Sequence, residues 1–161
     1  MSRAADPHRL SLADPATVER LGAAVASRLR AGEAICLFGP LGAGKTTLAR
    51  GLIRALTSPD EDVPSPTFTL VQLYAGPEFA IAHFDLYRLT RGEEAFELGL
   101  DEALEDGAAV IEWSERLEGR LPRDRLDIVL ALSETGPERR MARLTGHGSW
   151  AGRETELASG I

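Results

Sequence analysis

Four residues in the first third of the chain have the types and the spacing of a phosphate-binding loop. Gly39, Gly44, Lys45 and Thr46 fit the pattern G-x-x-x-x-G-K-[ST]. Glycines let successive backbone N–H groups turn toward phosphate oxygens without clashes of a Cβ atom. The lysine of this pattern reaches the β- and γ-phosphates of a nucleotide, and the hydroxyl beside it binds Mg²⁺. The predicted phosphate contacts are Leu41, Gly42, Ala43, Gly44, Lys45, Thr46 and Thr47.

The segments on either side of the loop favour the same interpretation. An apolar run at residues 34–38 predicts a strand that enters the loop, and residues 48–56 have the leucine spacing of a helix that leaves it. A helix that begins near Lys45 adds the partial positive charge of its N-terminus to the phosphate site. Lys45 is also the only lysine of the chain, because the other basic side chains are arginines. The alternative, a plain glycine-rich turn, explains neither feature.

A phosphate-binding loop can also hydrolyse the nucleotide that it binds, and two acids that follow apolar runs are candidates for this reaction. Asp85 follows residues 81–84, and Glu112 follows residues 108–111. The carboxyl ends of strands in an α/β sheet meet at the ligand crevice, and hydrolysis needs acids near the metal and the attacking water. Lys45, Asp85 and Glu112 are therefore the predicted catalytic residues, and Thr46, Asp85 and Glu112 the predicted Mg²⁺ ligands. Which acid binds the metal stays open, and an exposed strand-end acid is the alternative for each.

For three further side chains the sequence gives weaker evidence of a role in the site. Thr67 follows two prolines that stiffen residues 63–67, so it is a candidate switch-like contact to the γ-phosphate or Mg²⁺, with an ordinary loop threonine as the alternative. His83 lies in an apolar run and is predicted to be a core histidine. Trp113 directly follows Glu112 and is predicted to pack in the core rather than at the nucleotide.

The composition narrows the ligand and the cellular setting. The chain has no asparagine and no second lysine, so the guanine-reading motif N-K-x-D is absent and ATP is the favoured nucleotide. A net charge of −7 argues against a surface that grips DNA or RNA directly. The single cysteine, Cys36, excludes an intramolecular disulfide. The chain shows no signal-peptide pattern and no apolar run of about 20 residues, which predicts a cytoplasmic protein without a membrane span.

The order of elements predicts an α/β protein with a P-loop NTPase-like, three-layer fold. We expect a mixed, mostly parallel central sheet, helices on both of its faces and antiparallel hairpins at residues 67–84 and 126–145. Asp14 and Pro15 predict the start of a helix that continues to about Arg30. The length of 161 residues indicates one domain, in which residues 1–8 and about 147–161 are expected to be loosely ordered.

Four sequence blocks together resemble the TsaE (YjeE) family of bacterial ATPases. The blocks are G-P-L-G-A-G-K-T-T at 39–47, S-P-T-F-T-L-V at 65–71, H-F-D-L-Y-R-L at 83–89 and I-E-W at 111–113. The resemblance extends from about residue 12 to residue 144. It implies a P-loop α/β fold and a weak, Mg²⁺-dependent ATPase. It also implies that this ATPase supports turnover of the TsaB–TsaD heterodimer, which transfers threonylcarbamoyl to adenosine-37 of tRNAs reading ANN codons, so tRNA is an indirect partner.

The resemblance also assigns residue roles and has two departures. It implies phosphate and Mg²⁺ roles for Lys45 and Thr46, and it adds Arg140, from a basic segment near the family's nucleotide. Pro40 and Ser114 replace the family's usual aspartate and proline, but neither is a predicted ligand.

Two other functions use the same loop: a small-molecule or nucleotide kinase, and a nucleotide-gated binding module with negligible hydrolysis.

Overall fold

The computed structural model describes residues 8–66 and 69–160. Thr67 and residues 1–7 of the expected loose N-terminal segment lie outside the described residues. The strands form one sheet of seven in the order β1-β7-β6-β2-β5-β4-β3. Their bounds are Arg9–Leu12 (β1), Ala34–Phe38 (β2), Val71–Ala75 (β3), Ala80–Asp85 (β4), Ala108–Glu112 (β5), Arg125–Leu132 (β6) and Arg140–His147 (β7).

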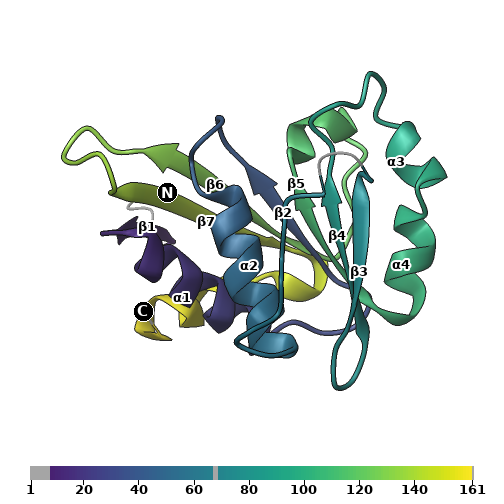
Figure 1. Ribbon diagram of the computed structural model, residues 1–161, viewed down its shortest axis with the longest axis horizontal. Coiled ribbons are helices and arrows are strands. Elements are labelled where there is room, and N and C mark those ends of the chain that lie inside the picture. Colours follow the sequence, from purple (N-terminus) through teal and green to yellow (C-terminus); the bar gives the residue numbers. More distant parts are fainter. Residues whose placement is uncertain (1–7, 67–68, 161) are drawn as a thin grey trace.

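The centre of the sheet is parallel and its margins are antiparallel, as predicted. Strand β2 pairs in parallel with β5 on one side and β6 on the other, and β4 pairs in parallel with β5. Both expected hairpins are present, β3 with β4 and β6 with β7. Strand β1 adds a further antiparallel pair at the β7 edge. The carboxyl ends of β2, β4 and β5 therefore lie at one edge of the sheet (Figure 1).

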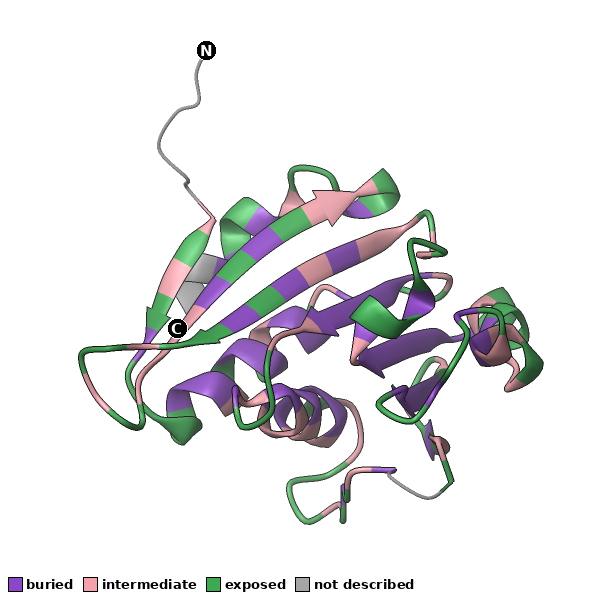
Figure 2. Cartoon of the chain, turned by 90° about the horizontal axis from the view of Figure 1, so that it is seen from above, coloured by how far each residue is buried: buried purple, intermediate pink, exposed green. Residues whose placement is uncertain are grey.

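Helices cover both faces of the central strands. The helices are α1 (Pro15–Ala26), α2 (Lys45–Leu56), α3 (Glu94–Glu97) and α4 (Leu100–Asp106), with short 3₁₀ turns at Ser114–Leu117, Gly148–Trp150 and Arg153–Gly160. Within β2, Ile35 and Leu37 pack in the core cluster under α1 and α2, whereas Ala34 and Cys36 pack in the cluster under α3 and α4. Figure 2 shows the consequence: strands β2, β4 and β5 are buried over nearly their whole length, while β6 and β7 alternate buried residues with intermediate or exposed ones.

The first helix begins as predicted but ends earlier. Asp14 is its N-cap, and the Asp14 carboxylate accepts a hydrogen bond from the backbone N–H of Thr17 at 2.9 Å. The helix ends at Ala26 rather than near Arg30, and the chain continues in tighter turns that still bury Leu29. The apolar spacing that suggested a longer helix is satisfied by this turn, because Leu29 reaches the core without helical backbone.

The C-terminal segment, described as far as residue 160, is packed against the domain, in contrast to the loose order expected for residues 147–161. Trp150 and Leu157 are fully buried in the cluster under α1. The buried carboxylate of Glu33 accepts hydrogen bonds from the Ser149 hydroxyl at 2.6 Å and from the Arg153 guanidinium at 2.5 Å. These partners are more than a hundred residues apart, which is why the local pattern did not indicate them. Among the described residues, no helix is both long and apolar enough to cross a membrane.

Cys36 lies in the middle of β2 and is buried, as predicted for a structural thiol. Burial raises the pKa of the Cys36 thiol to about 12, because the thiolate would be poorly solvated among apolar side chains. The thiol therefore stays protonated at neutral pH and acts as a small core residue.

Helices α1 and α2 approach each other closely through two glycines, which brings α2 and the loop before it to a defined place. A Cβ atom on Gly22 of α1 would lie 2.2 Å from the carbonyl oxygen of Leu48 in α2. A Cβ atom on Gly51 of α2 would lie 2.3 Å from the carbonyl oxygen of Glu19. Backbone therefore packs on backbone at this crossing.

We expect Gly22→Ala to lower the free energy of unfolding by about 1–3 kcal/mol, because the added methyl group forces the helices apart. This loss opposes the better helix propensity of alanine. Urea denaturation followed by circular dichroism measures the effect. Ala23→Leu, which adds a larger side chain on the exposed face of the same helix, is the matched control. Unchanged stability of Gly22→Ala would contradict the close approach.

Candidate nucleotide-binding site

The phosphate-binding loop connects β2 to α2, and its glycines are required by the backbone. Gly39 has a φ of +140°, and a Cβ atom there would lie 2.4 Å from the carbonyl oxygen of Leu130. Gly44 has a φ of +105° and is the N-cap of α2. Positive φ values strain other residues, so the loop adopts this path only with glycine at these two positions. The result is a loop that wraps around the N-terminus of a 12-residue helix, where anions are stabilised.

Lys45 is the first residue of α2, and its side chain lies back across the loop. Its Nζ donates to the carbonyl oxygens of Gly39 at 2.5 Å and Pro40 at 2.9 Å. Nζ is also 3.8 Å from the centroid of the Trp113 ring. The pKa of Lys45 lies below its usual value, because burial lowers it by more than the carboxylates of Glu115, Glu112 and Asp85 raise it. The ammonium group is thus held inside the site by carbonyls, an aromatic face and surrounding acids.

Glu112, at the end of β5, contacts the loop directly. Its Oε1 accepts a hydrogen bond from the Thr46 hydroxyl at 2.8 Å. Its Oε2 lies 2.6 Å from Nε2 of His83, which comes from β4. Only 2% of Glu112 is exposed, so a carboxylate there depends on these partners rather than on bulk water.

Asp85, at the end of β4, lies directly opposite Glu112 in the sheet and has different partners. Its Oδ2 accepts a hydrogen bond from the Ser65 hydroxyl at 2.8 Å, and its Oδ1 accepts one from the backbone N–H of Tyr87 at 3.1 Å. Ser65 belongs to the proline-containing loop that leads to residue 67. Asp85 therefore connects that loop to the same edge of the sheet.

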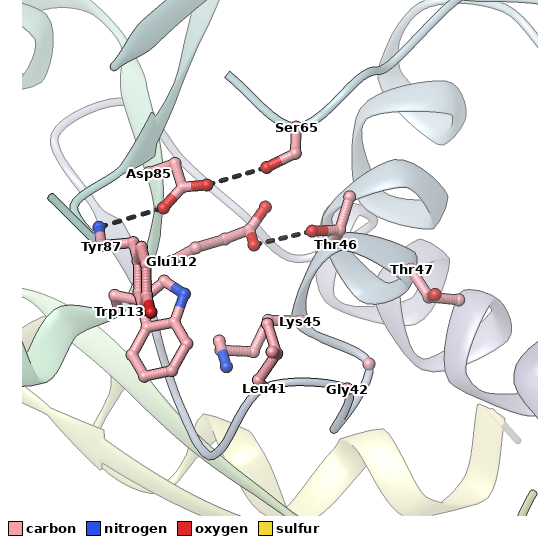
Figure 3. A pocket seen from close by; sticks show the side chains of 11 residues that line it. Leu41, Gly42, Lys45, Thr46, Thr47, Ser65, Asp85, Tyr87, Glu112 and Trp113 are labelled. Carbon is pink, nitrogen blue, oxygen red and sulfur yellow. Dashed lines mark hydrogen bonds between the residues drawn. The ribbon is translucent and has the colours of Figure 1, made fainter. Parts of the chain in front are cut away.

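These groups surround one pocket of about 400 Å³ (Figure 3). Figure 3 shows Asp85, Glu112, Thr46 and Lys45 around a common space, with Trp113 along one wall. The lining residues are Leu41, Gly42, Gly44, Lys45, Thr46, Thr47, Ser65, Asp85, Tyr87, Glu112 and Trp113.

The oxygen donors fit Mg²⁺. The set comprises one hydroxyl, from Thr46, and two carboxylates, from Asp85 and Glu112; Mg²⁺ in nucleotide sites prefers such hard ligands and takes the remaining ones from phosphate and water. Over residues 8–66 and 69–160 there is no cluster of three or more histidine, cysteine or acidic side chains of the kind that binds a metal without other ligands.

Most of the predicted nucleotide contacts line this pocket, but two of them do not. Of the predicted phosphate contacts, Ala43 is the one loop residue that does not line the pocket: its side chain is buried in the core and its N–H donates to the carbonyl oxygen of Pro40. Arg140 lies outside the pocket, beside the loop, where its guanidinium donates to the carbonyl oxygen of Gly42 at 3.1 Å. It lines a separate small hollow with Pro15 and Val18 of α1.

Some side chains at the site make contacts that the sequence did not indicate. Trp113 packs against the core cluster under α3 and α4, as predicted, but it also lines the pocket against Lys45. Its ring lies at a tilt to that of Tyr87, with ring centroids 5.0 Å apart. His83 is fully buried, as predicted for a core histidine, and its partner is Glu112, which the sequence did not indicate. Ser65 was not indicated; its position two residues before the predicted switch threonine was the available signal.

Comparison with known proteins gives one family. The family model described as "Threonylcarbamoyl adenosine biosynthesis protein TsaE" matches residues 12–141. A curated tRNA threonylcarbamoyladenosine biosynthesis protein TsaE from Rickettsia bellii is 39% identical over 122 residues, which cover 76% of this chain and 83% of the relative. Its counterpart from Streptomyces coelicolor is 38% identical over 149 residues, which cover 89% of this chain and 100% of the relative.

A solved structure agrees with this assignment. The crystal structure of Bacillus subtilis YdiB is similar to the fold described above, with a TM-score of 0.76 and 28% sequence identity. The match covers 94% of this chain and 93% of the YdiB chain. The matched residues 12–141 include the loop, both strand-end acids and Arg140. The chain therefore belongs to the TsaE family of threonylcarbamoyl adenosine biosynthesis proteins.

Proposed function

We propose that this chain is the ATPase of tRNA threonylcarbamoyladenosine formation. It hydrolyses ATP with Mg²⁺ in the cytoplasm and supports turnover of a TsaB–TsaD transferase, which modifies adenosine-37 of tRNAs reading ANN codons. The observation that supports this most is the 2.8 Å contact between Thr46 and Glu112. It joins the phosphate-binding loop to a strand-end acid in one pocket, an arrangement that hydrolysis needs and that phosphate binding alone does not.

The geometry suggests a division of labour between the two acids. We propose that Glu112, which already contacts the Thr46 hydroxyl, holds Mg²⁺ together with Thr46. Asp85 faces the same pocket without that contact and is the proposed group that orients the attacking water. Bound Mg²⁺ would neutralise charge on the β- and γ-phosphates as it develops.

Lys45 supplies a second source of charge stabilisation. Its Nζ now donates to two carbonyl oxygens of the loop, and in the nucleotide complex it would exchange them for phosphate oxygens. Thr67 remains the proposed switch-like residue, since the loop that carries it is attached to Asp85 through Ser65. Arg140 remains a proposed nucleotide contact, because it lies beside the loop at Gly42.

Reconstitution tests this function. The purified chain is mixed with TsaB, TsaD, threonylcarbamoyl-adenylate, tRNA and Mg-ATP, and modified tRNA is counted per transferase. We expect many modified tRNAs per transferase with this chain and about one without it. Free phosphate should appear with no phosphorylated acceptor. A single turnover in both reactions would refute the proposed role, and a phosphorylated small molecule would instead indicate the kinase.

A further inference from the structure

His83 is a fully buried polar residue next to the proposed chemistry. It lies in β4 with 0% of its surface exposed. Its Nε2 is 2.6 Å from Oε2 of Glu112. An ionised carboxylate can only accept hydrogen bonds, so opposite the ionised form of Glu112 the Nε2–H group of His83 is the hydrogen-bond donor.

The sheet register explains how this contact arises. Asp85 lies opposite Glu112, and His83 lies opposite Val110, two residues earlier on β5. His83 and Glu112 are therefore diagonal neighbours on one face of the sheet, and their side chains bridge this diagonal at 2.6 Å. Both side chains point to the face that carries α2, where Thr46 lies.

The two donors hold the Glu112 carboxylate at both of its oxygens. Thr46 donates to Oε1 at 2.8 Å, and His83 lies at Oε2 at 2.6 Å. One donor alone would leave the carboxylate free to rotate about its terminal torsion, which is broad in glutamate. With two donors on different oxygens, the plane of the carboxylate is defined and Oε1 is directed at the loop.

Packing alone does not account for a histidine at this position. Its second ring nitrogen, Nδ1, is buried and has no hydrogen-bond partner within the part of the chain that the structure describes. Burying an unpaired polar atom costs stability, whereas an apolar side chain of similar size would avoid that cost. The polar contact that the ring does make is with Glu112, so the requirement for histidine lies in that contact.

We infer that His83 is a positioning residue for Glu112: it holds the carboxylate in the orientation in which Oε1 meets Thr46 and a metal ion. This inference rests on the proposed function, because it concerns the acid assigned to Mg²⁺. Partners that orient a metal-binding carboxylate typically contribute about 10–100-fold in metal affinity or activity.

Two substitutions and one matched control test the inference. His83→Leu removes the donor, and His83→Gln keeps an N–H donor near the place of Nε2. His147→Leu is the control, since His147 also pairs with a carboxylate, Asp127, at 3.2 Å, but on the half-exposed end of β7. The readouts are Mn²⁺ affinity in the presence of a non-hydrolysable ATP analogue by electron paramagnetic resonance, analogue affinity in EDTA, kcat, KM and the melting temperature.

His83→Leu is expected to weaken Mn²⁺ binding and to lower kcat, each by about 10–100-fold. KM and the analogue affinity in EDTA should stay within about threefold, because His83 does not line the nucleotide pocket. His83→Gln should recover most of the Mn²⁺ affinity, and His147→Leu should match the unmodified chain. If His83→Leu does not fold, His83→Met takes its place in the comparison.

Two results would overturn the inference: Mn²⁺ affinity unchanged in a folded His83→Leu, or equal losses in folded His83→Leu and His83→Gln. Failure of the proposed function is recognised separately. In that case the unmodified chain binds Mn²⁺ with the analogue but releases no phosphate from ATP, and the Mn²⁺ affinities still decide the role of His83.

Discussion

Glu112→Gln is expected to lower ATP turnover by about 10²–10³-fold while nucleotide affinity changes by less than about threefold. Glutamine keeps the size of the side chain but removes its negative charge, and its amide nitrogen cannot accept a hydrogen bond. Thr46 and His83 each contact one oxygen of this carboxylate, so the amide nitrogen forces one of the two hydrogen bonds to break or to reverse its direction. Steady-state phosphate release measures turnover, and calorimetry with a non-hydrolysable ATP analogue measures affinity.

The control for this variant is Glu105→Gln, which makes the same change at an exposed residue of α4. It should behave like the unmodified chain in both measurements. Full turnover in Glu112→Gln would show that the strand-end glutamate is not needed for hydrolysis. A loss of nucleotide binding as large as the loss of turnover would assign Glu112 to binding instead.

Lys45→Ala is expected to reduce affinity for Mg-ATP by about 10–100-fold and to abolish measurable turnover. Hydrogen bonds to charged groups contribute about 1.5–3 kcal/mol each, and no other lysine exists to replace this one. Arg50→Gln removes a positive charge from the same helix at a position outside the pocket and should leave both quantities unchanged. Calorimetry and phosphate release provide the numbers.

The single lysine also allows a chemical test of the same prediction in the unmodified chain. An amine-acylating reagent can label only Lys45 and the N-terminal amine. Mg-ATP should protect Lys45 and leave the N-terminus reactive, as read by mass spectrometry of peptides. Equal labelling of Lys45 with and without the nucleotide would contradict a phosphate contact.

Most of the fold could be predicted because its elements are marked locally. Asp14 and Pro15 mark the start of α1, the glycine pattern marks the turn from β2 to α2, and the apolar runs mark the central strands. The predicted end of α1 and the predicted loose C-terminal segment were wrong, because tertiary contacts outweigh the local sequence pattern at these two places. Leu29 reaches the core beyond the end of α1, and the C-terminal segment is held by Glu33 and by burial of Trp150.

The same distinction, between local sequence pattern and tertiary contacts, applies to the site. The sequence by itself determined the phosphate-binding loop, its single lysine and the two acids at strand ends, because each depends on residues adjacent in the chain. Only the tertiary structure decided that Glu112 rather than Asp85 contacts Thr46. The reason is strand order: β5 lies beside β2, and β4 lies one strand further from it. The contacts of His83 with Glu112, Ser65 with Asp85 and Trp113 with Lys45 likewise join residues that are distant in the sequence and close only in the folded sheet.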